Sequence, residues 1–260
     1  MARGTITGRR RRPRAARLAV AAAVVSASML AAGCGSTAGS RAEDDGVVVM
    51  AASSLSDVLE AVFEGRESVT PVFAASSTLV AQLAAGAEAD VLITADAATM
   101  DRAVAEGSVR GEPVLIATNN LVLATPAGNP GGVTGLADLS RRGLLVGLCA
   151  AEVPCGALAQ RALGEAGVTP SADTLEPNVR ALAAKISLGE LDAGLVYATD
   201  ARTAGLATVG APELLDHRNG YHMAAIADEP APEVQTVIDD FTDPGSSGAE
   251  ALHAHGFGRP

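Results

Sequence analysis

The chain has 260 residues, enough for one large or two medium domains, and it is acidic, with 19 Lys and Arg against 30 Asp and Glu and a formal net charge of −11. It contains two Tyr, four Phe and no Trp, so it has few aromatic rings on which nucleic-acid bases could stack. Because an acidic surface also repels phosphate backbones, nucleic-acid binding is excluded.

The first 33 residues have the pattern of an export signal. They hold seven Arg and no acidic residue, and an apolar run from Leu18 to Leu30 leads into the small residues of "LAAGC". This run is shorter than the roughly 18 residues that a membrane-spanning helix needs. We therefore predict a signal peptide over residues 1–33, with the general and the twin-arginine export routes both open. Its removal leaves 12 basic and 30 acidic residues, a formal charge of −18.

Cys34 directly follows Ala-Ala-Gly, which resembles a lipobox, although Ala31 stands where Leu is commonest. We expect Cys34 to be the lipid-modified first residue of the mature chain. Residues 34–46 then form a flexible, Gly- and Ser-bearing tether between the anchor and the folded part. Ordinary secretion, with a Cys there by chance, is the alternative.

From residue 47 onward, strand-like and helix-like segments alternate. The run "VVVMA" (47–51) is continuously apolar, as in a strand that is buried on both faces. Strands separated by helices are typical of an α/β fold with mostly parallel sheets. The expected strands are 47–51, 69–75, 89–95, 120–128, 143–149, 193–198 and 221–227, and the expected helices are 54–65, 78–86, 97–107, 156–167, 178–189, 232–243 and 248–258.

Hydroxyl side chains gather at two successive strand-to-helix turns. Ser53 and Ser54 occupy the first turn, and Ser76, Ser77 and Thr78 the second, in a stretch (73–96) without Lys or Arg. Such turns line the crevice at the carboxyl ends of parallel strands, where ligands bind. Free N–H groups and the helix dipole favour an anion there, and hydroxyls add donors. Simple helix capping by each Ser is the alternative.

Several segments carry a family resemblance: "AASSL", "FAASSTLVAQLAAGAEADVLITAD", "VPCG", "NVRALA", "GLVYATDA" and "HGF". Together they resemble the molybdate-binding subunit of ABC-type molybdate importers, over about residues 47–257. The resemblance implies a two-lobed, type II-like periplasmic-binding-protein fold, in which each lobe is a mostly parallel sheet flanked by helices. The expected lobes are 47–120 with 222–260, and 121–221, hinged near Asn120 and Tyr221.

The resemblance also implies the ligand site. In that family a tetrahedral oxyanion is held between the lobes by hydrogen bonds alone, without a cofactor or any metal beyond the oxyanion itself. Ser54 and Ser76 would donate hydroxyl and backbone N–H groups, Cys155 and Val179 backbone N–H groups, and Tyr197 its phenol.

Local sequence agrees with these assignments to different degrees. Asn178 is a natural N-cap, which leaves the N–H of Val179 free in the first turn. The "PCG" segment opens a helix in the same way at Cys155. Tyr197 ends a buried strand, where a phenol needs a partner, and nearby backbone is the alternative partner.

The loop "GLCAAEVPCG" departs from the family pattern, because it is one residue longer and has Cys155 where Ala is usual. Cys149 and Cys155 are six residues apart in an exported protein, so we expect a disulfide between them. A two-Cys metal site is the alternative, but it lacks a nearby His. The four His show no ligand spacing with Cys.

Motifs for catalysis do not emerge from the sequence: there is no Ser-His-Asp order, GxSxG turn, HExxH or phosphate loop. Asp57, Asp96 and Asp200 are expected to cap and brace helices. We therefore expect a non-enzyme: a monomeric, lipid-anchored, extracytoplasmic protein that captures molybdate or tungstate and delivers it to an ABC permease. A carrier of sulfate or phosphate, or an enzyme that reuses the two lobes, is the alternative.

Overall fold

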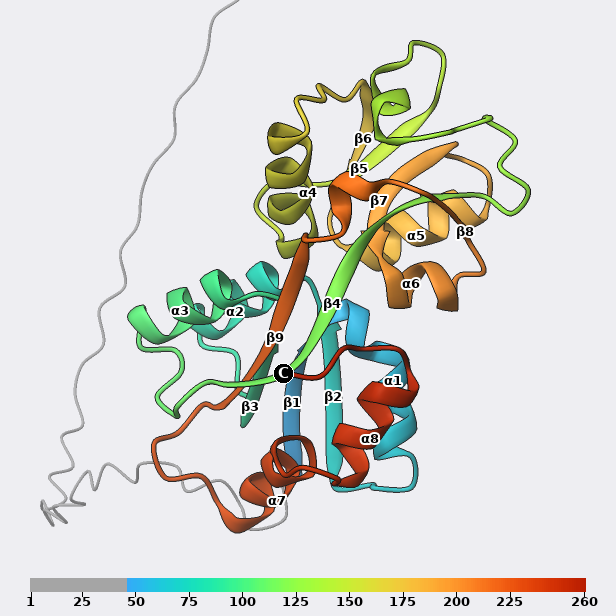
Figure 1. Ribbon diagram of the computed structural model, residues 1–260. Helices are drawn as coiled ribbons and strands as arrows, with labels where there is room; N and C mark the ends of the chain where they lie inside the picture. Colours follow the sequence, from blue (N-terminus) through green and yellow to red (C-terminus); the bar gives the residue numbers. More distant parts are fainter. Residues whose placement is uncertain (1–45) are drawn as a thin grey trace, which may run out of the picture. The chain divides into compact units, whose positions relative to one another are not determined.

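Figure 1 shows the computed structural model, which describes residues 46–260. The predicted signal peptide, Cys34 and nearly all of the predicted tether lie outside the described residues. The described part has two lobes, and the long strands β4 and β9 pass between them (Figure 1). None of its helices is both long enough and apolar enough to cross a membrane.

The regular elements follow the alternation that the sequence predicts. The strands are β1 (Val47–Ala52), β2 (Val69–Ala74), β3 (Val91–Thr94), β4 (Val114–Thr125), β5 (Val146–Cys149), β6 (Ala172–Glu176), β7 (Ala193–Tyr197), β8 (Ala207–Val209) and β9 (Arg218–Ala225). The α-helices are α1 (Ser56–Phe63), α2 (Ser76–Ala84), α3 (Ala97–Ala105), α4 (Pro154–Glu165), α5 (Val179–Ser187), α6 (Ala198–Thr203), α7 (Pro232–Thr242) and α8 (Ser247–Ala254). Short 3-10 helices are η1 (Ser53–Leu55), η2 (Leu136–Ser140) and η3 (Pro212–Leu214).

Each lobe is built on three parallel strands. In lobe I, β1 lies between β2 and β3, and in lobe II, β5 lies between β6 and β7. Two antiparallel strands connect these units in the order β2-β1-β3-β9-β4-β7-β5-β6, and β8 pairs with β4. The first part of β4 pairs with β9 and its last part with β7, so one strand belongs to both lobes. The predicted two-lobed α/β fold is confirmed.

The core of lobe I shows why β1 is apolar throughout. Val49 packs into a cluster with α1, α7 and α8, whereas its neighbour Met50 packs into a second cluster with α2 and α3. Successive side chains of a strand point to opposite faces, so the sheet has helices on both sides (Figure 1).

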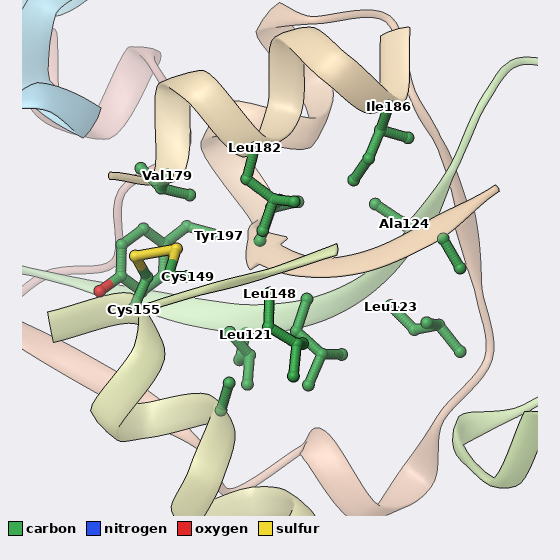
Figure 2. Packing of buried hydrophobic residues seen from close by; sticks show 14 of the residues in the cluster. Leu121, Leu123, Ala124, Leu148, Cys149, Cys155, Val179, Leu182, Ile186 and Tyr197 are labelled. Atoms are coloured by element: carbon green, nitrogen blue, oxygen red, sulfur yellow. A yellow bond between two sulfur atoms is a disulfide. The ribbon is translucent and has the colours of Figure 1, made fainter. Parts of the chain in front are cut away.

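Lobe II has one continuous core. Leu148 of β5, Leu123 of β4 and Leu182 of α5 belong to a single buried cluster, which also includes residues of α4 (Figure 2). Cys149, Cys155, Val179 and Tyr197 lie at the edge of this cluster that is nearest to lobe I. The residues of lobe II that lie nearest to lobe I are therefore fixed in position by their packing in this core.

Some elements differ from the expectation. β4 starts at Val114 instead of Asn120, because the polar residues 118–120 interrupt the apolar pattern of a strand that continues through them. The short strands β6 and β8 and the helix α6 were not predicted; β6 is mostly exposed, so it has little apolar signal. The predicted helix 248–258 is too long, since α8 ends at Ala254 and Gly256 adopts a φ of 89°.

Candidate functional site

A small cavity lies between the two lobes. The volume that the centre of a water-sized sphere can occupy in it is about 10 Å³, far below the roughly 300–1,000 Å³ of typical sites for organic ligands. All five predicted site residues line it, and each is between 1% and 7% exposed. The complete lining is Ala52, Ser53, Ser54, Ala75, Ser76, Ala95, Val153, Pro154, Cys155, Asn178, Val179 and Tyr197.

Helices from both lobes begin at this cavity. Ser54 lies in η1, Ser76 and Val179 are the first residues of α2 and α5, and Cys155 is the second residue of α4. Backbone N–H groups in a first turn have no acceptor within their own helix, and the helix dipole adds partial positive charge there. The cavity is therefore surrounded by donors that suit an anion.

The serines are not helix caps. Ala52 and Ala75 occupy the N-cap positions of η1 and α2, and neither helix has a side-chain cap hydrogen bond. The capping alternative is thus wrong for Ser54 and Ser76. By contrast, Asn178 caps α5 as predicted, because its Oδ1 accepts a hydrogen bond of 2.9 Å from the N–H of Ala181.

Ser76 and Tyr197 each accept a hydrogen bond from the protein. The N–H of Ala95 donates to Ser76 Oγ at 2.9 Å, and Nδ2 of Asn219 donates to the Tyr197 phenol oxygen at 2.7 Å. Nδ2 of Asn219 also lies 3.4 Å from the carbonyl oxygen of Pro154, an acceptor, which fixes the orientation of the amide. The hydroxyl proton of Ser76 and that of Tyr197 are consequently free for a ligand.

Ser54 belongs to a buried chain of hydrogen bonds that also includes Asn119 and Tyr221. Nδ2 of Asn119 donates to Thr199 at 2.8 Å and to the Tyr221 phenol oxygen at 3.4 Å. The Tyr221 hydroxyl and Ser54 Oγ are 2.7 Å apart. Either oxygen can be the donor in this hydrogen bond, and when Tyr221 donates, the Ser54 proton is left for the cavity. Of the hydroxyls at the site, those of Ser76 and Tyr197 are thus set to donate, and that of Ser54 can do so.

No charged side chain lines the cavity. Burial raises the pKa of the Tyr197 phenol, and burial also raises the pKa of Tyr221, so both phenols keep their protons at physiological pH. Asp200 of α6 is buried nearby, and its charge adds to the rise at both phenols. Burial, and secondarily the charge of Asp57, raises the pKa of Asp200 to about 7, against a lowering effect of Arg180.

The loop between β5 and α4 positions Cys155. A disulfide joins Cys149 to Cys155, whose Cα atoms are 5.8 Å apart, and Figure 2 shows it beside Tyr197. A Cβ at Gly156 would lie 1.8 Å from the carbonyl oxygen of Ala150, so only Gly permits this close turn. Within the described residues, no group of three or more His, Cys, Asp or Glu is placed to hold a metal ion.

Three residues that support the site were missed in the sequence. Asn119 and Asn219 are directly paired across β4 and β9, and Tyr221 lies two residues further along β9. All three are buried. For Asn119 and Asn219 the signal was the presence of Asn inside strands, where Asn is otherwise depleted.

The chain matches the family of bacterial extracellular solute-binding proteins over residues 47–258. It belongs to this family. The molybdate-binding protein ModA of Mycobacterium tuberculosis (strain ATCC 25618 / H37Rv) is 33% identical over 234 residues, which cover 87% of this chain and 88% of that protein. ModA of Escherichia coli (strain K12) is 30% identical over 241 residues, with 85% and 92% covered.

Solved structures of solute-binding proteins share the fold. The periplasmic molybdate-binding protein of Azotobacter vinelandii superposes with a TM-score of 0.66 at 18% identity, covering 82% of this chain and 99% of that one. The resemblance that the sequence motifs indicated is confirmed.

Proposed function

We propose that this solute-binding protein captures molybdate outside the cytoplasm and delivers it to an ABC permease. The observation that carries the proposal is a small cavity between the lobes that is lined by neutral side chains and lies at the starts of helices from both lobes. Relatives at 33% and 30% identity that are named as molybdate-binding proteins support this choice of ligand.

The number of donors accounts for useful affinity without a cation. The hydroxyls of Ser54, Ser76 and Tyr197, with the backbone N–H groups of Ser54, Ser76, Cys155 and Val179, offer about seven hydrogen bonds to a charged acceptor, at roughly 1.5–3 kcal/mol each. The gross sum is on the order of 10–20 kcal/mol, and association costs about 4–15 kcal/mol. Micromolar to nanomolar dissociation constants follow from the difference.

The remaining features belong to the same proposal. Tungstate can replace molybdate as the ligand. The protein uses no cofactor, and it binds a metal only as part of the oxyanion. The mature protein is a monomer anchored by a lipid on Cys34. The lobes, 47–120 with 222–260 and 121–221, close about a hinge near Asn120 and Tyr221. The cavity lining contains no acid–base pair, which disfavours an enzyme that reuses the lobes.

Alanine substitution of the two serines tests the proposal. Ser54→Ala and Ser76→Ala each remove one hydrogen bond to a charged ligand, so each should weaken molybdate binding at least about tenfold in calorimetry. Ser77→Ala is the matched control, because Ser77 follows Ser76 in α2 but does not line the cavity. Unchanged affinity in both Ser54→Ala and Ser76→Ala would refute the site.

A further inference from the structure

One arginine connects the two lobes at the edge of the site. The guanidinium of Arg180, in α5 of lobe II, donates to Ser56 Oγ from Nη2 at 2.8 Å and from Nε at 3.1 Å. Its Nη2 also contacts the Asp57 carboxylate, and both partners belong to the first turn of α1 in lobe I. Within lobe II, Arg180 Nη1 lies 3.9 Å from Asp200 Oδ1.

The position of this arginine is unusual in electrostatic terms. It follows Val179 at the start of α5, where a cation is unfavourable because the helix dipole is positive at that end. Asp57 and Asp200 offset this effect, one from each lobe. A residue that breaks a local rule and is compensated in this way is a candidate for a functional role.

The contact joins the same two segments that carry the anion donors. Arg180 is adjacent to Val179, and Ser56 is two residues beyond Ser54, yet Arg180 itself does not line the cavity. Separation of the lobes would break the contacts with Ser56 and Asp57, whereas the approach to Asp200 lies within one lobe and would remain.

We propose that Arg180 is a latch that holds the lobes closed and so sets how slowly the bound anion is released. This inference rests on the proposed function. An interaction that is made only in the closed state stabilises that state relative to the open one, without any contact to the ligand. The expected effect is therefore on the release rate, while the association rate, which depends on the open form, should hardly change.

The chain offers a matched control in another ion pair. Arg66 and Asp240 contact each other within lobe I, and their side chains are 35% and 22% exposed, against 26% and 38% for Arg180 and Asp57. Because both partners lie in one lobe, opening leaves this pair intact. Arg66→Gln should then have no effect on release.

The test measures molybdate release by stopped-flow tyrosine fluorescence and affinity by calorimetry. The chain has two Tyr and no Trp, and Tyr197 and Tyr221 are both buried at the site, so the emission reports the site directly. Asp57→Asn and Arg180→Gln should each speed release about three- to tenfold, a range suited to a partly exposed pair with charge-assisted hydrogen bonds. The double variant should be no faster than Arg180→Gln alone, and Asp57→Glu should restore slow release.

Asp57→Asn is the decisive variant, because it keeps both Arg180 and Asp200 and removes the charge that Arg180 contacts across the lobes. Wild-type release rates in both Asp57→Asn and Arg180→Gln, in a protein that binds molybdate and loses affinity on Ser76→Ala, would overturn the latch and leave the proposed function standing. Additive effects in the double variant, or an equal effect in Arg66→Gln, would also overturn it. Failure of the wild-type protein to bind molybdate, tungstate or sulfate would overturn both.

Discussion

Two hydroxyls that line the cavity, those of Ser76 and Tyr197, have their donor direction set by a neighbouring N–H. Ala95 donates to Ser76 and Asn219 to Tyr197, while Ser54 forms a hydrogen bond with Tyr221, which accepts from Asn119. A hydroxyl can donate or accept, but one that already accepts from a fixed N–H presents its proton to the next partner. Residues outside the cavity, such as Asn219, therefore orient the hydroxyl protons toward the ligand, and the site favours a ligand that accepts hydrogen bonds.

Replacing one of these donating side chains by an acceptor should weaken ligand binding strongly. In Asn219→Asp, a carboxylate replaces the amide that donates to Tyr197, so the phenol would donate to the carboxylate and present a lone pair to the cavity. The ligand would lose a hydrogen bond and gain a nearby negative charge. We expect molybdate affinity to fall at least about a hundredfold, the equivalent of two contacts to a charged group.

Calorimetry of Asn219→Asp, with its melting temperature as the control for folding, checks this expectation. Wild-type affinity in a folded variant would show that the direction of the phenol proton is not set by Asn219.

Asp200 should make the ligand-free protein less stable as the pH rises. Burial raises its pKa from an ordinary 3.8 to about 7, so between these values the folded protein keeps a proton that the unfolded chain has released. Stability then falls with increasing pH across this window, by an amount on the order of 4 kcal/mol when the window is complete. Asp200→Asn should remove this dependence and raise the melting temperature at pH 8 more than at pH 5.

Thermal unfolding of the ligand-free protein and of Asp200→Asn at several pH values measures the effect. Arg180 and Asp57 are the ionisable groups that act on the pKa of Asp200, and the nearby phenols of Tyr197 and Tyr221 remain neutral throughout this range. Parallel stability curves for the two proteins would contradict the prediction.

At the scale of elements, the loop between β5 and α4 leads to Cys155, one of the proposed anion donors. The disulfide and the close turn at Gly156 both fix the first turn of α4, where Cys155 lines the cavity. Closing such a short loop stabilises the fold by about 2 kcal/mol in the chain-entropy view of disulfides. The Cys155 side chain is thus used for the loop, while its backbone remains available for the ligand.

Buried elements could be predicted from the sequence because their apolar patterns are strong. The strands β1 and β3 and the helices α1, α3 and α5 appear close to where the alternation of apolar residues placed them. β6 and β8 were missed because an exposed edge strand needs little apolar surface. The start of β4 was missed because pairing with β9, a contact between distant parts of the chain, decides it.

The site was predictable to the extent that it depends on local sequence. Ser54, Ser76, Cys155 and Val179 lie at helix starts, which Ser, Pro and Asn mark in the sequence, and all four line the cavity with Tyr197. The supporting contacts of Asn119 and Asn219, like the contact of Arg180 with Asp57, join residues far apart in the chain. No local pattern encodes which distant residues meet, so only the folded structure reveals them.

The whole molecule combines a strongly acidic exterior with a neutral interior site. With residues 1–33 removed, the formal charge is −18, which opposes the approach of a dianion at long range. Binding must then come from short-range donors in the cavity between the lobes, where burial lowers the dielectric and strengthens each hydrogen bond. The selectivity of the protein is accordingly a property of the closed form.

The choice among oxyanions follows from the donors that close around the ligand. Phosphate near neutral pH carries a proton and needs an acceptor, but no carboxylate lines the cavity, and the hydroxyls at Ser76 and Tyr197 already accept from the protein. Molybdate, tungstate and sulfate are fully deprotonated and differ mainly in size, since metal–oxygen bonds are longer than sulfur–oxygen bonds. Backbone N–H groups held by packed helices cannot shrink onto the smaller anion without longer, weaker hydrogen bonds. We expect molybdate and tungstate to bind comparably, sulfate at least about a hundredfold more weakly, the equivalent of one or two impaired hydrogen bonds, and phosphate hardly at all. Competition titrations at fixed ionic strength measure this order, and displacement of molybdate by sulfate or phosphate at similar concentrations would contradict the assignment of the ligand.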